Sequence, residues 1–340
     1  MGKLDKLKKI NFKKVNVKVP DVSKVIRVHA KPDRFAIWTA KAVAFMLTPP
    51  RQRKMMGQDV VETQYAFLKG VIDSEHWREK CSELGFRERL HKMETKLLPG
   101  IMTHIVLRKR RIEESVRREI AKGCKQIVSF GAGYDTLLPR LAEEFPDVQC
   151  IEADLLSTQR AKVSTLRTRP RNLHFVDVNL SEPYLERVMM ESTPFNRRER
   201  TYFIAEGVLM WLDDDDVERL LVFMQDHGAL SSRFAFTFFE RGVDHKAFFP
   251  EISFFTDAMF RLLKVHLGWG VRIEHVSRYL NDRYFGLLEV ETPGELRQRY
   301  ASETLPPLKK TPFGDYLAFA ELVFIDEGPQ GTGPNQRKFV

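Results

Sequence analysis

The chain has few of the features that mark a metal-binding, disulfide-linked or membrane-spanning protein. It holds three cysteines in 340 residues (Cys81, Cys124 and Cys150), and no two of them form a Cys-x-x-Cys pair. An odd number of scattered cysteines indicates neither a zinc cluster nor a disulfide framework. No apolar run reaches the ~18 residues of a membrane span. The first residues have no apolar stretch behind their lysines, so we expect no signal peptide and a reducing, cytoplasmic location.

Most of the chain also carries no excess of positive or negative charge. The net charge is +9, but residues 1–34 hold eleven Lys and Arg against three Asp, and the remaining 306 residues hold 44 basic and 43 acidic side chains. A basic tail can bind nucleic acid or anionic lipid. The nearly neutral body offers no basic groove for a nucleic acid. We therefore expect residues 1–34 to be a solvated basic extension and expect no nucleic-acid partner.

A glycine-rich segment at residues 126–136, QIVSFGAGYDT, lacks two well-known nucleotide signatures. The apolar run, the Gly-x-Gly and the helical pattern after them predict strand, turn and helix, with Asp135 as the helix N-cap. Gly131 and Gly133 allow a sharp turn and a close approach of the backbone to a ligand. A dinucleotide fingerprint would need a third glycine where Thr136 stands, and a phosphate loop would need Gly-Lys-Ser/Thr.

A carboxylate follows this turn at Asp154, where a second apolar run from Val148 to Ala153 ends. A carboxylate at that position can accept two hydrogen bonds from a ribose diol, each charge-assisted and so roughly 1.5–3 kcal/mol. A Gly-x-Gly alone is often only a structural turn. Followed by a ribose carboxylate, and without a pyrophosphate signature, it favours a nucleoside that carries no phosphate. S-adenosylmethionine (SAM) is the commonest such ligand.

Apolar strand patterns alternate with helical patterns from about residue 103 onward. Strands and helices at this spacing predict an α/β fold with a doubly wound, mostly parallel seven-stranded sheet. Ser181 to Met190 is expected to be a helix with Pro183 in its first turn. The four acids from Asp213 to Asp216 open another helix and complement its dipole, which we favour over a metal site. Further strands are expected at residues 173–178, 201–206, 233–239, 284–290 and 317–325.

The segment 35–100 has helical patterning and stands outside this alternation. Residues 35–47 are so apolar that other elements must cover them. We expect a helical cap over the ligand site that also forms an apolar acceptor pocket. The alternative is that these helices merely brace the sheet. The aromatic residues expected in the pocket are Phe35, Trp38, Phe45, Tyr65 and Phe67.

Three motifs resemble the leucine carboxyl methyltransferase family: FGAGYDT at 130–136, IEAD at 151–154 and IAEGVLMWL at 204–212. That family includes protein phosphatase methyltransferases and bacterial relatives, such as polyketide carboxyl methyltransferases, that methylate small molecules. The resemblance covers roughly residues 35–325. It implies a Rossmann-like, SAM-binding methyltransferase domain over residues 101–327, and residues 328–340 are expected to be a disordered tail.

The resemblance also implies roles for individual residues in binding the cofactor SAM. Gly131 would lie against the methionine part of SAM, and Asp154 would bind the ribose hydroxyls. Asp177 and Val178 would close on the adenine, and Glu206 would lie beside the amino-acid end near the acceptor. Asp177 and Glu206 could instead simply cap helices.

The family also has an arginine, on the helix before the first strand, that holds the SAM carboxylate. Arg110 is the best match in this chain. The local sequence LRKRRIEE departs from the usual spacing, so Arg108 remains an alternative.

Three functions fit these observations. The first is a SAM-dependent O-methyltransferase that forms a methyl ester on the carboxylate of a small, polyketide-like acceptor. The second is a protein C-terminal leucine carboxyl methyltransferase, although Gly207 and Met210-Trp211 differ from the Ala-Glu-Cys-Val-Leu-Val-Tyr segment of the phosphatase enzymes. The third is a SAM-binding protein without turnover.

The acceptor atom can be approached from the side chains that a methyltransferase would need. A carboxylate acceptor is ionised at pH 7 and needs no general base, whereas a hydroxyl acceptor would need one. No His or Lys stands out as a base, so we predict no catalytic side chain and favour a carboxylate. His104 and His174 are the first candidates if a base is required, and no metal ligands are predicted at either position.

Overall fold

The computed structural model describes residues 33–242, 267–300 and 314–323. The expected basic extension lies outside these residues except for Asp33 and Arg34. A helix expected over residues 254–266 and the expected tail over residues 328–340 also lie outside them. Within the described part, every helix is too short or too polar to span a membrane.

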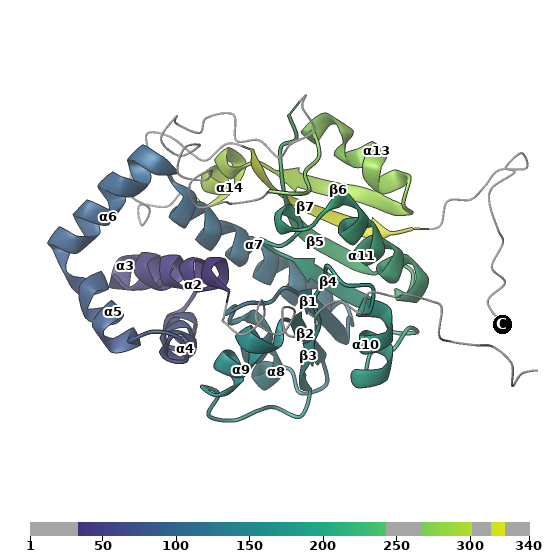
Figure 1. Ribbon diagram of the computed structural model, residues 1–340, viewed down its shortest axis with the longest axis horizontal. Helices are drawn as coiled ribbons and strands as arrows, with labels where there is room; N and C mark the ends of the chain where they lie inside the picture. The colour runs from purple at the N-terminus through teal and green to yellow at the C-terminus, as the bar shows by residue number, and fades with distance from the viewer. Residues whose placement is uncertain (1–32, 243–266, 301–313, 324–340) are drawn as a thin grey trace, which may run out of the picture.

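One seven-stranded sheet forms the centre of the molecule, with the strand order β3-β2-β1-β4-β5-β7-β6 (Figure 1). Strands β1 to β5 are mutually parallel, whereas β7 is antiparallel to both of its neighbours. This confirms the predicted mostly parallel sheet. The strands are β1 (Gln126–Phe130), β2 (Gln149–Asp154), β3 (Leu173–Asp177), β4 (Thr201–Ala205), β5 (Arg233–Phe239), β6 (Phe285–Glu291) and β7 (Asp315–Leu322).

The chain order reverses between β1 and β4, which are neighbours in the sheet. In open α/β sheets, ligands bind outside the carboxyl ends of the strands at such a reversal. The Gly131 turn leaves β1 at this point, and Glu206 directly follows β4. The topology alone therefore brings two of the expected site residues to one edge.

Helices cover both faces of the sheet, and each face has its own hydrophobic core. Helices α7 (Ile101–Ala121), α8 (Leu137–Glu144), α9 (Leu156–Val163) and α14 (Pro293–Arg299) lie on one face. Helices α10 (Leu185–Ser192), α11 (Asp214–His227) and α13 (Val276–Asn281), and the short 3-10 turns η2 (Leu209–Trp211) and η3 (Ile273–His275), belong to the other.

The observed starts of two helices can be compared with the expected ones. The four acids from Asp213 to Asp216 open helix α11, as expected, and Asp213 and Asp216 form a reciprocal capping box at its start. Helix α10, however, begins at Leu185 and not at Ser181. The side chain of Asn179 accepts from the Ser181 amide at 3.1 Å. This local side-chain bond holds the chain in a turn ahead of Pro183 and delays the helix.

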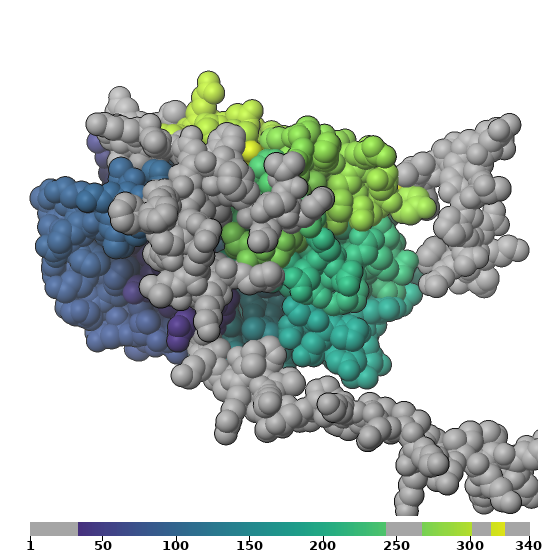
Figure 2. All heavy atoms as spheres, turned by 45° about the horizontal axis from the view of Figure 1, so that its top comes forward, coloured from purple at the N-terminus to yellow at the C-terminus, as the bar shows by residue number. Residues whose placement is uncertain are grey.

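Among the described residues, five helices precede α7: α2 (Arg34–Leu47), α3 (Pro50–Arg53), α4 (Gln58–Lys69), α5 (Ser74–Ser82) and α6 (Leu84–Leu97). Helix α2 packs directly against α7. The side chain of Asp33 caps α2 at the Phe35 amide. Helix α2 ends at Leu47, and Pro49 is the N-cap residue of the next helix, α3. The residues from Val43 to Leu47 are all buried. Figure 2 shows these blue helices as one side of the visible surface, opposite the green region around α13.

Candidate functional site

A cavity of about 730 Å³ lies over the carboxyl edge of the sheet. One end is lined by Gly131, Asp154 and Val178, which come from β1, β2 and β3 and the loops after them. The other end is lined by Phe239 and Asp315, from β5 and β7. The volume falls within the range of natural small-molecule sites, roughly 300–1,000 Å³.

The two glycines of the turn after β1 have left-handed backbones, with φ of +59° at Gly131 and +50° at Gly133. A Cβ added to Gly131 would lie 2.5 Å from Cγ2 of Val208. A Cβ added to Gly133 would lie 3.2 Å from Cβ of Ala36 on α2. Any larger residue would be strained at either position and would collide at Gly131. The turn is thus fitted closely between the β4 loop and the first cap helix.

Asp154 is fastened to this turn at the end of β2. One of its carboxylate oxygens accepts from the Gly133 amide at 2.5 Å, and the other accepts from the Leu155 amide at 2.6 Å. Burial raises the pKa of Asp154 to about 6, although the two amide hydrogen bonds oppose the rise. The structure therefore holds a single carboxylate rigidly beside the glycine turn and on the cavity wall, where a diol can donate to it.

The two residues expected at the adenine end have different positions. Val178 is buried and lines the cavity. Asp177 is exposed, and its carboxylate accepts from the Leu156 amide at the start of α9 at 2.9 Å. Asp177 does not belong to the cavity wall, so the helix-capping alternative describes what it does in this structure.

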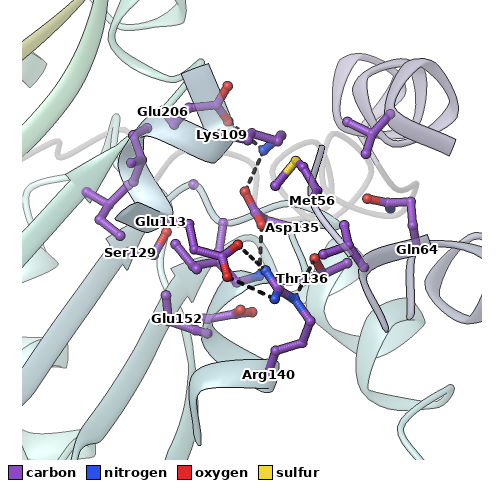
Figure 3. Close-up of a pocket in the computed structure, with 18 residues that line it drawn as sticks. Met56, Gln64, Lys109, Glu113, Ser129, Asp135, Thr136, Arg140, Glu152 and Glu206 are labelled. Atoms are coloured by element: carbon purple, nitrogen blue, oxygen red, sulfur yellow. Dashed lines mark hydrogen bonds and ion pairs between the residues drawn. The ribbon is translucent and has the colours of Figure 1, made fainter. Parts of the chain in front are cut away.

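Two neighbouring cations on α7 join the cavity's other charged residues into a cluster. Arg108 donates through Nε to Glu206 and through Nη1 to Asp315 at 2.5 Å. Lys109 Nζ donates to Glu206 at 2.8 Å and to Asp135 at 2.5 Å. Figure 3 shows Lys109 between Glu206 and Asp135. Through these bonds, helix α7 is tied to the residue after β4, to the first residue of β7 and to Asp135, just after the glycine turn.

Burial and ion pairing oppose each other in this cluster. Burial would raise the pKa of each carboxyl group, but the cations outweigh it and lower the pKa of Glu206 and of Asp315. Lys109 likewise lowers the pKa of Asp135 to about 2 against its burial. All three carboxylates are therefore ionised at neutral pH, with two cations between them.

Arg110 lies away from the cavity, on a different face of α7. Its guanidinium donates to Glu114 at 3.0 Å and lies over the ring of Tyr300 at 4.4 Å. Residues two apart on a helix point roughly 200° apart, so Arg108 and Arg110 cannot share a face. Arg108 lines the cavity and Arg110 does not. We therefore correct the sequence-based choice and move the expected carboxylate contact from Arg110 to Arg108.

A second, smaller pocket of about 20 Å³ lies behind the glycine turn. It has room for about one water molecule. Figure 3 shows Arg140 reaching from α8 toward Glu113 of α7, with Glu152 of β2 nearby. The Arg140–Glu113 pair includes a hydrogen bond of 3.0 Å. Polar residues that sequence reasoning did not single out thus support the turn from below.

The sequence matches the family model of the leucine carboxyl methyltransferases over residues 60–225. The matched region includes the glycine turn, Asp154, Arg108 and Glu206. These residues line the end of the cavity that is expected to hold the cofactor. Asp315 and the cavity residues of α2 lie outside the match.

Two curated relatives carry the name "Putative S-adenosyl-L-methionine-dependent methyltransferase". The protein of Streptomyces coelicolor is 30% identical and that of Streptomyces avermitilis 29% identical, each over 144 residues. Each match covers 41% of this chain and 50% of the relative, so the chain spans about half the length of the curated relatives it matches.

Two crystal structures show the same fold at low sequence identity. A protein of Thermobifida fusca described as a "putative methyltransferase" has a TM-score of 0.52 at 16% identity, covering 87% of this chain and 96% of its own. A DUF574 family protein of Streptomyces avermitilis has a TM-score of 0.53 at 11% identity, covering 71% of this chain and 92% of its own.

The aromatic residues expected in an acceptor pocket fall into two groups. Phe35 and Trp38 line the cavity and are 40% and 42% exposed. Phe45, Tyr65 and Phe67 are buried in the core and do not belong to the cavity wall. Aromatic side chains of α2 therefore contribute to the cavity wall, whereas those of α4 are packed in the core beneath it.

The two candidate histidines lie in different parts of the structure. His104 on α7 is buried with its Nε2 3.2 Å from Asp315 Oδ2, at the edge of the charged cluster. His174 on β3 contacts Gln149 at 2.9 Å and lies outside the cavity wall. Within the described ranges, no group of three His, Cys, Asp or Glu side chains is arranged to hold a metal ion.

Proposed function

We propose that the protein is a SAM-dependent O-methyltransferase. The observation that carries the proposal is the Asp154 carboxylate, held by the amides of Gly133 and Leu155 on the wall of the cavity. The ribose of SAM would donate to Asp154, and the adenine would pack against Val178. The glycine turn would allow the methionine part to pass close to the backbone at Gly131.

The methionine end of SAM carries a carboxylate and an ammonium group, and the cluster on α7 offers a partner for each. Arg108 and Lys109 would hold the carboxylate, and Glu206 would face the ammonium. Without ligand both cations are already paired with carboxylates of the cluster, so the site is pre-formed. A zwitterion can enter without leaving a buried charge unpaired.

The chemistry demands positioning more than acid–base work. The sulfonium of SAM already activates its methyl group, so the protein must place an acceptor oxygen in line about 3 Å away and exclude water. The oxygen–methyl bond forms as the sulfur–methyl bond breaks, and S-adenosylhomocysteine (SAH) leaves. The apolar walls of the cavity, from Trp38, Met102, Ile105 and Trp211, serve the exclusion of water.

The acceptor is proposed to be the carboxylate of a small organic molecule. Arg34, at the start of α2, lines the cavity and makes no ion pair with any described residue. Its guanidinium would pair with the carboxylate of the acceptor, and the apolar walls suit an apolar body more than a charged peptide. A protein C-terminal leucine and SAM binding without turnover are the two alternatives.

A cell extract incubated with SAM and the enzyme tests this function. We expect products heavier by one CH₂ unit than in a control with Asp154→Ala, and we expect mild alkali to cleave them. Because a carboxylate is already ionised, kcat/KM for the acceptor at saturating SAM should be flat from about pH 6 to 8. Absence of any methylated product, with SAH still bound, would favour the non-catalytic alternative.

A hydroxyl acceptor is a second candidate, and the contact of His104 with Asp315 favours it. In that case the acceptor must lose a proton during attack. The same experiment separates the two candidates, because a hydroxyl acceptor gives an alkali-stable ether and a rate that rises about tenfold per pH unit.

A further inference from the structure

Asp315, the first residue of β7, has one carboxylate oxygen that lacks a partner. Its Oδ2 accepts from Arg108 Nη1 at 2.5 Å and lies 3.2 Å from His104 Nε2. Its Oδ1 makes no hydrogen bond within the described part of the chain, although the residue is only 1% exposed. Buried polar atoms are nearly always hydrogen-bonded, so an exception on a cavity wall calls for a ligand atom.

The charge on Asp315 decides what kind of ligand atom fits. Burial opposes ionisation, but Arg108 and His104 outweigh it and keep the pKa of Asp315 below its ordinary value. An ionised carboxylate only accepts hydrogen bonds. The group that completes Oδ1 must therefore be a donor, such as a hydroxyl or an ammonium.

The sheet order indicates whether that donor belongs to the cofactor or to the acceptor. This step depends on the proposed function, in which SAM lies along β1 and β2. Strand β7 is three strands from β1 and four from β2. With about 4.8 Å between strands, Asp315 is about 14 Å from the β1 strand and farther from β2. It pairs with Phe239, the last residue of β5, so it lies at the same carboxyl edge. The methionine end of SAM would reach Glu206, after β4, and Arg108 bonds both Glu206 and Asp315. Asp315 therefore lies beyond the cofactor, with the Arg108 guanidinium between it and the ammonium of SAM.

Besides the charged residues of the cluster, apolar side chains line the same cavity as Asp315. Met102 and Ile105 of α7, Phe239 of β5, and Leu97 of α6 line this part of the wall together with Asp315. A charged acceptor-only oxygen in such surroundings discriminates strongly, because an apolar group placed against it leaves the carboxylate unpaired.

We propose that Asp315 binds a hydroxyl or ammonium group of the methyl acceptor, whose apolar body lies along α6 and α7. Arg108 holds the Asp315 carboxylate in place by a hydrogen bond, with His104 beside it, so Arg108 positions this contact without touching the acceptor group. The substrate class is therefore an apolar molecule that carries a hydrogen-bond donor, in addition to the oxygen that is methylated.

Isomeric probes test the contact without knowledge of the natural acceptor. Octan-1-ol and 1-methoxyheptane have the same atoms, but only the alcohol can donate. With the protein saturated with SAH, binding of each can be followed by the fluorescence of Trp38 and Trp211, which line the cavity. We expect the alcohol, and also octylamine, to bind at least tenfold more tightly than the ether, because a hydrogen bond to a charged group is at stake.

Two variants of Asp315 test whether its carboxylate causes the preference for a hydrogen-bond donor. Asp315→Asn should reduce the preference for octylamine about tenfold and for the alcohol less, and Asp315→Leu should abolish both. Glu291→Gln is the matched control: Glu291 is also buried and paired with an arginine of α7, Arg111, but does not line the cavity. It should leave both preferences unchanged.

The outcomes separate this inference from the proposed function. Equal binding of the alcohol and the ether to the wild type, or no binding of either probe, would overturn the Asp315 contact. An unchanged preference for the alcohol and the amine in both Asp315 variants would also overturn it. Calorimetry with SAH on every variant reports on the cofactor site and on folding. Failure of the wild type to bind SAH would overturn the proposed function instead.

Discussion

The guanidinium of Arg108 forms ion pairs with two carboxylates, those of Glu206 and Asp315. Arg108→Ala would leave both of them with one cation fewer, and breaking a buried ion pair costs about 3–5 kcal/mol. We expect a loss of that order in the free energy of unfolding, measured by urea denaturation. SAH affinity should also fall, because the expected carboxylate contact is removed.

Arg110→Ala is the matched control on the same helix. The Arg110 side chain is 35% exposed and pairs with Glu114 one turn away. Exposed ion pairs of this kind contribute about 0.2–1 kcal/mol. We expect a change in unfolding free energy below about 1 kcal/mol and unchanged SAH affinity. If the two arginine variants behaved alike, the assignment of Arg108 to the site would be wrong.

The raised pKa of Asp154 predicts a pH dependence of SAH binding. Burial raises this pKa from 3.8 to about 6, so the folded protein holds a proton that the unfolded chain releases between these values. Ionisation of Asp154 therefore costs folding stability as the pH rises through that window. A ribose diol binds the ionised form, so SAH affinity should increase up to about tenfold per pH unit below pH 6 and level off above it.

Asp154→Asn should remove this pH dependence. The comparison is needed because burial also raises the pKa of Glu152, on the same strand, to about 7. Calorimetry of SAH binding from pH 5 to 8 in both proteins separates the two groups. A slope that persists in Asp154→Asn would assign the titration to Glu152.

The sequence led to the carboxylate at Asp154 and to the glycine turn because each follows directly from a strand end. The choice between Arg108 and Arg110 could not be made in this way. It depends on which face of α7 meets the sheet, and a run of four cations carries no periodic apolar signal to show it. Lys109 and Asp315 were missed for the same reason, since their partners lie in distant parts of the chain.

At the scale of elements, α2 and α4 divide the work of the cap. Trp38 on α2 lines the cavity, so Trp38→Ala should raise the acceptor KM several-fold and leave SAH affinity unchanged. Tyr65 on α4 is buried and its hydroxyl lies 2.6 Å from that of Thr48. Tyr65→Ala should therefore cost about 3–5 kcal/mol of unfolding free energy, as other large-to-small aromatic changes do.

Steady-state kinetics and denaturation on the two variants measure this division. The opposite pattern, with Trp38→Ala unfolding the protein and Tyr65→Ala altering only KM, would mean that α4 and not α2 forms the acceptor wall. Residue composition could not separate the two helices, because a cavity wall and a core both favour aromatic side chains. Only the packing of α4 against α2 and α9 shows which face is covered.

At the scale of the molecule, the sheet was predictable because each parallel strand is an apolar run followed by a helical pattern. The pairing of β7 between β5 and β6 was not predictable, since it joins segments far apart in the chain. That pairing places Asp315 at the cavity. The cavity is thus built from local motifs at the end expected to hold the cofactor and from long-range topology at the end proposed for the acceptor.

Residues 1–34 carry a net charge of +8, whereas the rest of the chain carries +1. Deletion of the first 20 residues should leave SAH affinity and the unfolding free energy unchanged, because the described site residues begin at Asp33. Calorimetry and denaturation on the truncated protein check this. Loss of SAH binding would mean that the extension contributes to the cofactor site.

The central claim is that the cavity binds SAM through Asp154, and titration calorimetry with SAH tests it most directly. We predict binding to the wild type with one site per chain. Asp154→Ala should weaken it by roughly 2–3 kcal/mol, because two charge-assisted hydrogen bonds are lost and water replaces them only in part. No binding by the wild type, or equal binding by the variant, would contradict the account.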